Sequence, residues 1–501
     1  MLRFCTFLVI CALFLALFAL PTTAMPYNRT QVIQNLLDDA VRISGTPGVS
    51  AAIIYNNQTY MFSAGHTSIR NRSVETEVDE YTLFVIGSLS KAFTGSAILL
   101  LQERGMLCLS DRIDAHLPWF YLLYQNQPAE VTILHLLNHT SGLSWRHSDA
   151  PRIAEGLNAK RYTIEPFIGA SLDYVPGTVF SYANANFNIL GLIIEYVTGQ
   201  TFDTFMREQF FSPLGMTNTF VYQADAIATG RMAQGHRHGF FLTFPFDTPI
   251  YGGMIPTGFI ISNIVDMSRW MSIQLGLVYD IPEEFVRVVK NSHETNVLGA
   301  SMGEYQFYSA GWVIDTQARV VTHAGQTPSF LANVVIKIHE QQGAIFLSNG
   351  TSMNFGLARD MLSIIGGDTS VTYTRGENQR IDIRNSLFII AMIISMIYCI
   401  IFGIRCRIKE KPVITKSKMI WVSVSGLVAL FGLFRIITYP RTVGSGWHYI
   451  FDWNPPSLTI SVLLFPLVFI AMAWYTYVQN PKKPVELVGE DNNTQEDIEN
   501  G

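Results

Sequence analysis

The chain has 501 residues, of which 49% are hydrophobic, and its formal net charge is −5 at pH 7. It lacks the basic excess that nucleic-acid-binding proteins use, and it is more apolar than a purely soluble enzyme needs to be. We therefore expect a globular part joined to membrane-spanning segments, and no nucleic-acid partner.

Residues 1–24 have the pattern of a secretory signal peptide. An arginine precedes an apolar run over residues 4–20, and small residues at 22–24 fit a cleavage site. The alternative is an uncleaved signal anchor, because the apolar run is long. Of the five cysteines only Cys108 falls in the expected globular part, so no disulfide is expected there. The histidines and cysteines lack metal-ligand spacing, so we expect no metal and no cofactor.

Residues 25–365 are predicted to form one α+β unit. The early strand pair is expected to complete an antiparallel sheet built from the late strands, with an all-helical lobe inserted between them. The expected elements are a helix over 26–44, a hairpin over 49–55 and 58–64, helices and loops to about 277, strands over 312–316, 320–322, 332–338 and 343–348, and a closing helix over 355–365.

The clearest chemical motif is Ser88-Leu89-Ser90-Lys91, at the start of a predicted helix that runs to Gly105. Residues three apart on a helix share a face, so the Ser88 hydroxyl and the Lys91 amine can meet. Ser88 is then a candidate nucleophile with a base beside it. The alternative is a helix N-cap followed by a solvated lysine.

Two later motifs could join this pair. Tyr182 and Asn184 lie between a Pro-Gly turn and an apolar helix pattern over residues 189–197. His323-Ala324-Gly325-Gln326 follows a β-branched pair and sits on a predicted strand. An ordinary strand histidine is the alternative for His323.

The last third of the chain predicts a membrane domain. Residues 366–384 read as a linker, residues 385–479 contain three apolar spans, and residues 480–501 form an acidic tail. Basic residues between the first two spans and after the third predict cytoplasmic segments, which leaves the globular unit outside. The predicted spans are 386–404, 419–438 and 458–478.

The three motifs, in this order, resemble the serine β-lactamase and penicillin-binding-protein superfamily, whose signature includes S-x-x-K. The sequence of residues 131–143 is similar to the corresponding segment of the class C-like branch of this superfamily. The resemblance implies a β-lactamase/transpeptidase-like antiparallel sheet flanked by helices with an all-helical lobe. It also implies a serine hydrolase with Ser88 as nucleophile, Lys91 and Tyr182 sharing the base role, and a phenolate favoured by a cationic lysine.

The resemblance further implies substrate contacts at Asn184, His323, Gly325 and Gln326, with the Ser88 and Gln326 amides as the oxyanion hole. A domain of this kind followed by three spans is similar to membrane-bound prodrug-activating peptidases, such as the one that matures colibactin. Those enzymes remove an acyl-D-asparagine cap from nonribosomal peptides. The sequence departs from them at three expected pocket positions, which are Asn184, Met254 and Thr327.

Two other functions remain open at this point. The first is a D-alanyl carboxypeptidase, esterase or β-lactamase of the same fold. The second is a membrane sensor or transport-accessory protein that uses an acylated serine. The expected partners are a peptide or acyl-amide substrate and the lipid bilayer, with an exporter or a second copy as candidates for the spans. By resemblance we expect a bacterial inner membrane, a periplasmic catalytic domain and a cytoplasmic C-terminus.

Overall fold

The computed structural model describes residues 25–69, 76–147, 152–156, 158–295, 299–409, 413–443 and 447–479. The predicted signal peptide and acidic tail lie outside these residues. The chain forms two compact units. The first comprises the described residues up to Leu387 and those from Thr438 to Ile460, and the second comprises Phe388–Ile437 and the described residues from Ser461.

An eight-stranded sheet forms the centre of the first unit, and all its neighbouring strands are antiparallel. The early hairpin pairs with the last strand, as the sequence predicts; Ile53 stands opposite Ala344. Asn56 and Asn57 both have positive φ in the hairpin turn, which asparagine tolerates well. In spatial order the strands are β2 (Gln58–Gly65), β1 (Gly48–Tyr55), β14 (Gln342–Ser348), β13 (Leu331–Lys337), β12 (Val320–Gln326), β11 (Trp312–Asp315), β10 (Gln306–Ser309) and β9 (Ala300–Ser301).

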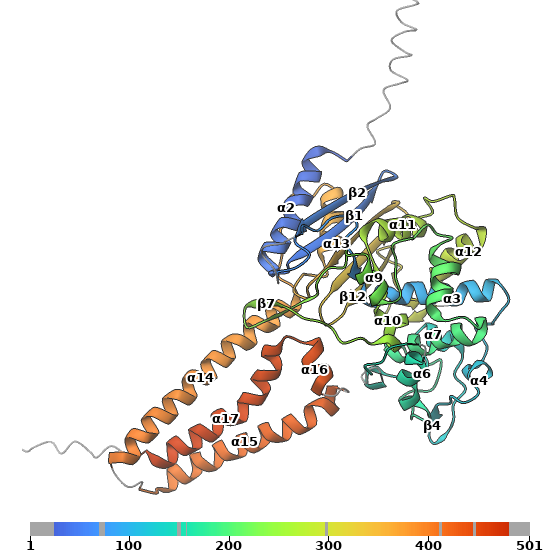
Figure 1. The fold of residues 1–501 in the computed structure, drawn as a ribbon. Coiled ribbons are helices and arrows are strands. Elements are labelled where there is room, and N and C mark those ends of the chain that lie inside the picture. Colours follow the sequence, from blue (N-terminus) through green and yellow to red (C-terminus); the bar gives the residue numbers. More distant parts are fainter. Residues whose placement is uncertain are drawn as a thin grey trace, which may run out of the picture. The chain divides into compact units, whose positions relative to one another are not determined.

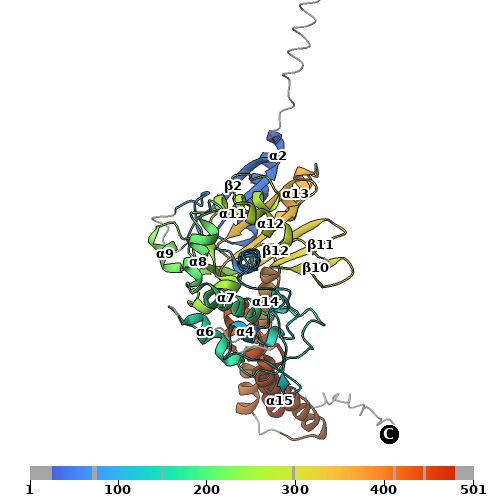
Figure 2. The same ribbon diagram turned by 90° about the vertical axis from the view of Figure 1, so that its right-hand side faces the viewer.

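Both faces of the central strands are buried, because successive side chains of a strand point to opposite faces. Val49, Ala51 and Ile53 pack with the terminal helices α2 (Tyr27–Ser44) and α13 (Leu357–Ile365) on one face. Ala52 and Ile54 belong to the larger core on the other face. Figures 1 and 2 show α2 and α13 beside β1 and β2, and α11 (Ile264–Gln274) on the opposite side.

The larger core continues into a helical lobe built between β2 and β9. Its centre is α3 (Ser90–Glu103), which is buried over most of its length and packs against α7 (Asn184–Thr198). The other helices are α4 (Ile113–His116), α5 (Ile133–Leu137), α6 (Ala159–Ile164), α8 (Phe202–Phe205), the π-helix η5 (Met206–Phe211), α9 (Gln223–Ala228), α10 (Ile255–Gly258) and α12 (Glu283–Ser292), with 3₁₀ turns η2 (Gly87–Leu89), η3 (Trp145–His147), η4 (Glu165–Phe167) and η6 (Gly252–Met254).

Three short strand pairs lie within this part of the chain, and the sequence did not predict them. Each pair has two to four residues per strand, which is too short for a periodic pattern. They are β3 (Phe84–Val85) with β8 (Ile261–Ser262), β4 (Leu123–Tyr124) with β5 (Gln127–Pro128), and β6 (His236–Gly239) with β7 (Leu242–Pro245).

Within the described residues, three helices are long and apolar enough to cross a membrane: Glu377–Ile408, Lys416–Thr438 and Pro456–Val478. They belong to α14 (Glu377–Lys409), α15 (Lys416–Val443) and α17 (Pro456–Val478). The helix α14 begins inside the segment predicted as a linker, so residues 377–384 are helical. A short helix, α16 (Trp447–Trp453), lies between α15 and α17 and belongs to the first unit.

Candidate active site

The serine and lysine of the S-x-x-K motif meet at the start of α3. Ser88 lies in the 3₁₀ turn η2, and Lys91 lies in the first turn of α3. Their Oγ and Nζ atoms are 3.0 Å apart. Ser90, between them, points away and donates its hydroxyl to the Gly87 carbonyl oxygen at 2.7 Å, which fixes the turn.

Burial controls the charge of Lys91. Its side chain is fully buried, and Nζ lies 2.9 Å from Asn184 Oδ1 and 2.7 Å from the Thr257 carbonyl oxygen. The loss of hydration lowers the pKa of Lys91 well below its usual value. A neutral amine has two hydrogens and one lone pair. In that form the two oxygens would accept both hydrogens, which would leave the lone pair for the proton of the Ser88 hydroxyl.

Tyr182 approaches the same serine from the other side. Its phenol donates to Ser88 Oγ at 3.1 Å, and Lys91 Nζ lies 4.9 Å from the centre of its ring. Burial raises the pKa of Tyr182, so the neutral phenol is favoured. Both pKa shifts run opposite to the expected phenolate beside a cationic lysine, because burial disfavours the charged form of both groups.

Two glycines bring strand β12 against the turn that carries Ser88. A Cβ on Gly325 would lie 2.1 Å from the Ile86 carbonyl oxygen, and a Cβ on Gly87 would lie 2.4 Å from the Gln326 amide nitrogen. Gly87 also has a φ of +59°, which favours glycine. This approach brings the Gln326 amide beside the Ser88 turn, where an oxyanion hole would need it.

His323 faces the interior beneath Tyr182. Its Nε2 lies 3.2 Å from the Tyr308 hydroxyl, and its ring centre is 6.4 Å from that of Tyr182. Burial lowers the pKa of His323 to about 4, so the ring is neutral at pH 7. His323 thus packs with the Tyr182 ring, while its neighbours Ala324 and Gln326 line the cavity beside Ser88.

The active-site cavity, about 400 Å³ in volume, opens beside Ser88 and Tyr182. Asn184 and Met254 line it, as predicted pocket residues. Thr327 does not. Its hydroxyl accepts the Phe330 amide at 3.0 Å, and its side chain lines a neighbouring cavity. The cavity is also lined by residues that the sequence did not indicate: Trp145, Thr257, Gly258, Phe259, Phe355, Tyr449, Ile450, Trp453 and Asn454.

Four of these residues come from α16 and the residue after it, between the last two apolar helices. Tyr449 and Trp453 stack with ring centres 5.1 Å apart, and Tyr449 also contacts Trp145 at 6.4 Å between ring centres. These residues form one wall of the active-site cavity, the α16 wall.

Buried polar contacts hold α16 in this position. Arg237, on β6, donates to the carbonyl oxygens of Phe451 and Asn454, the latter at 2.6 Å. The Tyr251 hydroxyl donates to Asp452 at 3.2 Å. Buried Asp382, in the first turns of α14, accepts the Ser457 hydroxyl at 2.6 Å. The wall is thus tied to the β6–β7 strand pair, to Tyr251 and to the start of the first apolar helix.

We expect Arg237→Met to loosen this wall. The substitution keeps the side-chain length but leaves the carbonyls of Phe451 and Asn454 without their donor, which costs about 1–3 kcal/mol for each group left buried. KM should rise about tenfold or more, and hydrogen exchange should accelerate in residues 447–454. Arg231→Met is the matched control, because Arg231 is exposed and its ion pair with Asp79 is 3.5 Å long. An unchanged KM in Arg237→Met would contradict the anchoring role.

Comparisons with known proteins found similar chains and folds. A family model described as Beta-lactamase matches residues 33–364. Protein flp of Staphylococcus aureus (strain NCTC 8325 / PS 47) is 24% identical over 454 residues, covering 86% of this chain and 87% of that protein. A penicillin-binding protein of Bacillus subtilis (strain 168) is 28% identical over 346 residues, covering 65% of this chain and 73% of that protein. The structure of a β-lactamase/D-alanine carboxypeptidase from Pseudomonas syringae superposes with a TM-score of 0.59 at 20% identity, covering 68% of this chain and 99% of that one.

Proposed function

Because this chain belongs to the beta-lactamase family, whose members are serine hydrolases, we propose that it is a membrane-anchored hydrolase that cleaves an amide through an acyl-Ser88 intermediate. The observation that carries the proposal is the contact of Ser88 Oγ with two groups, Lys91 Nζ at 3.0 Å and the Tyr182 hydroxyl at 3.1 Å. Nucleophile and base within hydrogen-bond reach are what acyl transfer requires.

The proposed reaction begins with Lys91 as a neutral base. Ser88 Oγ attacks the amide carbonyl carbon while its proton passes to Lys91 Nζ, and the backbone amides of Ser88 and Gln326 stabilise the oxyanion. When the C–N bond breaks, the leaving amine takes a proton from Lys91, relayed by the Tyr182 hydroxyl. Water then attacks the acyl-enzyme while Lys91 accepts a proton from it. When the bond between the acyl carbon and Ser88 Oγ breaks, Lys91 returns this proton to Oγ, and the acid product leaves.

A neutral leaving group fits the active-site cavity better than a free carboxylate does. Among the described residues that line the cavity, none is arginine, lysine or histidine. The nearby His323 is neutral at pH 7, because burial lowers its pKa to about 4. Recognition of a terminal carboxylate ordinarily uses a cationic side chain. We therefore favour an amidase or endopeptidase over a D-alanyl carboxypeptidase.

The proposed acyl donor is an N-acyl-D-amino acid group, by resemblance to prodrug-activating membrane peptidases. We do not propose that the amino acid in this acyl donor is asparagine. The Asn184 oxygen already accepts the Lys91 amine, Met254 is apolar, and Thr327 lines a different cavity. We further propose that α14, α15 and α17 cross the membrane, with the hydrolase unit on the extracytoplasmic side.

An acyl-trapping experiment tests the proposed function. The full-length protein in detergent is incubated with an N-acyl-D-amino acid joined by an amide to a fluorogenic amine, and with the matching D-alanyl-D-alanine substrate. We expect release of the amine, and after rapid acid quench a mass increase on the peptide that contains Ser88. Faster turnover of the carboxylate substrate, or turnover without labelling of Ser88, would contradict the proposal.

A further inference from the structure

The hairpin formed by β6 and β7 has a turn of uncommon composition. Its two central residues, Phe240 and Phe241, have φ of +55° and +66°. A two-residue turn of this kind favours asparagine and glycine, because bulky side chains are strained in the left-handed region. The proposed reaction uses neither phenylalanine ring, so their presence needs another explanation.

Two other hairpin turns in this chain show the polar alternative. Asn56-Asn57 joins β1 to β2, and Gln125-Asn126 joins β4 to β5. All four of these residues have positive φ, as Phe240 and Phe241 do. The same protein thus makes this backbone turn from asparagine and glutamine elsewhere. Turn geometry alone therefore does not account for the two phenylalanines.

The β6–β7 hairpin has its charged and polar side chains inside and its apolar side chains outside. The buried residues of β6 include His236, Arg237 and His238. The turn and the first residue of β7 form an exposed apolar tip, which consists of Phe240, Phe241 and Leu242 with exposed fractions of 41%, 44% and 68%. A hairpin whose tip faces water has the opposite arrangement.

Asp382, in the first turns of α14, holds the apolar tip in place. Its Oδ1 accepts the Phe240 amide at 2.8 Å, and its Oδ2 accepts the Phe241 amide at 2.9 Å. The same Oδ1 accepts the hydroxyl of Ser457, at the start of α17, at 2.6 Å. Figure 1 shows β7 beside the start of α14. One buried carboxylate thus joins the apolar tip to the beginnings of two apolar helices.

The apolar tip lies at the level where these two helices would enter a bilayer. The apolar run of α14 begins at Leu387, five residues after Asp382, which is about 7.5 Å along a helix. The apolar run of α17 begins at Leu458, and a Cβ on Gly239 would lie 3.0 Å from Pro456, two residues earlier. The headgroup layer is about 5–8 Å thick on each side of a bilayer. If the helices cross the membrane, the tip therefore falls within this layer.

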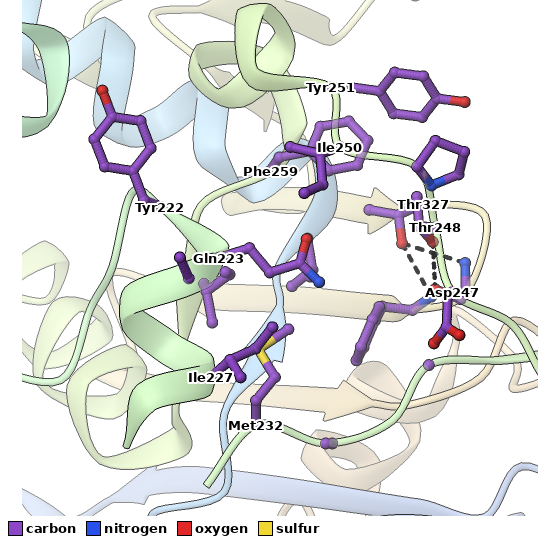
Figure 3. A pocket seen from close by; sticks show the side chains of 18 of the residues that line it. Tyr222, Gln223, Ile227, Met232, Asp247, Thr248, Ile250, Tyr251, Phe259 and Thr327 are labelled. Carbon is purple, nitrogen blue, oxygen red and sulfur yellow. Dashed lines mark hydrogen bonds between the residues drawn. The ribbon is translucent and has the colours of Figure 1, made fainter. Parts of the chain in front are cut away.

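The same hairpin is continuous with the residues that hold the α16 wall. Arg237, on β6, donates to the carbonyl oxygen of Asn454 at 2.6 Å. After β7 the chain runs through residues 247–251, which Figure 3 shows beside the neighbouring cavity, to Tyr251. The Tyr251 hydroxyl donates to Asp452 of α16. Both sides of the hairpin thus lead to residues that bind the α16 wall.

We propose that the apolar tip inserts into the lipid leaflet that α14 and α17 enter. The tip is then a third attachment of the hydrolase unit to the membrane, and it holds the α16 wall close to the bilayer surface. Aromatic rings suit the headgroup layer, and their insertion buries apolar surface, which offsets the strain of the turn. This inference rests on the proposed membrane crossing of the helices and not on the chemistry at Ser88.

Photo-crosslinking in vesicles tests the inference. Full-length protein carrying Phe241→benzoylphenylalanine is reconstituted into phosphatidylcholine vesicles, irradiated and examined by mass spectrometry. We expect a phospholipid adduct on the peptide that contains the apolar tip. Tyr279→benzoylphenylalanine is the control, because Tyr279 is 88% exposed in the segment between α11 and α12 and should give no such adduct. A crosslink from position 241 to a second copy of the chain, or no crosslink, would overturn the inference.

A double variant separates membrane contact from turn stability. Phe240→Asn with Phe241→Gly supplies the residues that the turn prefers, so the melting temperature in detergent should stay the same or rise. With Leu242→benzoylphenylalanine as the reporter in both backgrounds, the double variant should lose most of the phospholipid adduct that the wild-type turn gives. An unchanged adduct with a lower melting temperature would mean that the phenylalanines serve packing, and would contradict the proposed insertion.

Two further measurements distinguish the possible failures. If alkaline carbonate strips the wild-type protein from the vesicles, the proposed membrane crossing fails, and the inference fails with it. If the protein resists carbonate and position 241 acquires no lipid, only the inference fails. Acylation of Ser88 by the fluorogenic substrate is measured separately, so loss of that signal would count against the proposed hydrolysis and not against the apolar tip.

Discussion

Replacing Ser88 with alanine is expected to abolish amide hydrolysis, with kcat lower by about 10⁴-fold or more. The reason is that Lys91 and Tyr182 both converge on Ser88 Oγ, and neither can form the acyl intermediate without it. The measurement is release of the fluorogenic amine by purified full-length protein. The acyl mass on the Ser88 peptide should disappear at the same time.

Ser96→Ala is the matched control for this experiment. Ser96 lies on the same helix, is fully buried, and its hydroxyl has no hydrogen-bond partner among the described residues. Its loss should leave kcat unchanged and should not lower the melting temperature. If Ser88→Ala keeps normal turnover while Ser96→Ala behaves as expected, hydrolysis arises elsewhere and the assignment of Ser88 is wrong.

The second large effect is expected at Lys91. Lys91→Met should lower kcat by about 10³-fold or more, because the proton of Ser88 then lacks an acceptor. In the wild-type protein, the active form is the one in which the Lys91 amine is neutral and can accept this proton. Since burial lowers the pKa of Lys91 well below its usual value, activity should persist at pH values below that usual pKa and should fall as pH drops through the lowered pKa.

Two further variants make this prediction specific. Asn184→Asp puts a carboxylate where Oδ1 now lies 2.9 Å from Nζ, which favours the ammonium and should move the acidic limb of the pH profile up by about 1–3 units. Lys160→Met is the control. Lys160 is also buried, but its Nζ forms an ion pair of 3.1 Å with Glu195 and does not line the cavity. It should lower stability and leave the pH profile alone. An unshifted limb in Asn184→Asp would exclude Lys91 as the titrating base.

Local sequence patterns were sufficient for the fold and for part of the site. Serine and lysine three positions apart meet because helical geometry alone brings them together. The early hairpin joins the late strands because alternating apolar residues must be buried on both faces. The first prediction depends on the spacing of two residues within one helical turn. The second depends on the fold class that the order of predicted strands and helices indicates.

The rest of the site depends on packing between distant segments. His323 faces Tyr182 rather than the cavity, and its neighbour Ala324 takes the cavity position, because side chains alternate along β12. The charges of Lys91 and Tyr182 follow from burial, which residue type alone does not reveal. The α16 wall depends on Arg237 and Asp382, and neither residue stands in a recognisable motif.

The α16 wall also sets an order in time. The ribosome makes Ser88 and the whole hydrolase sheet first, and makes Tyr449 and Trp453 only after the first two apolar helices. One wall of the cavity is therefore the last part of the site to be made. A chain that ends at residue 385 would contain Ser88, Lys91 and Tyr182 but would lack this wall.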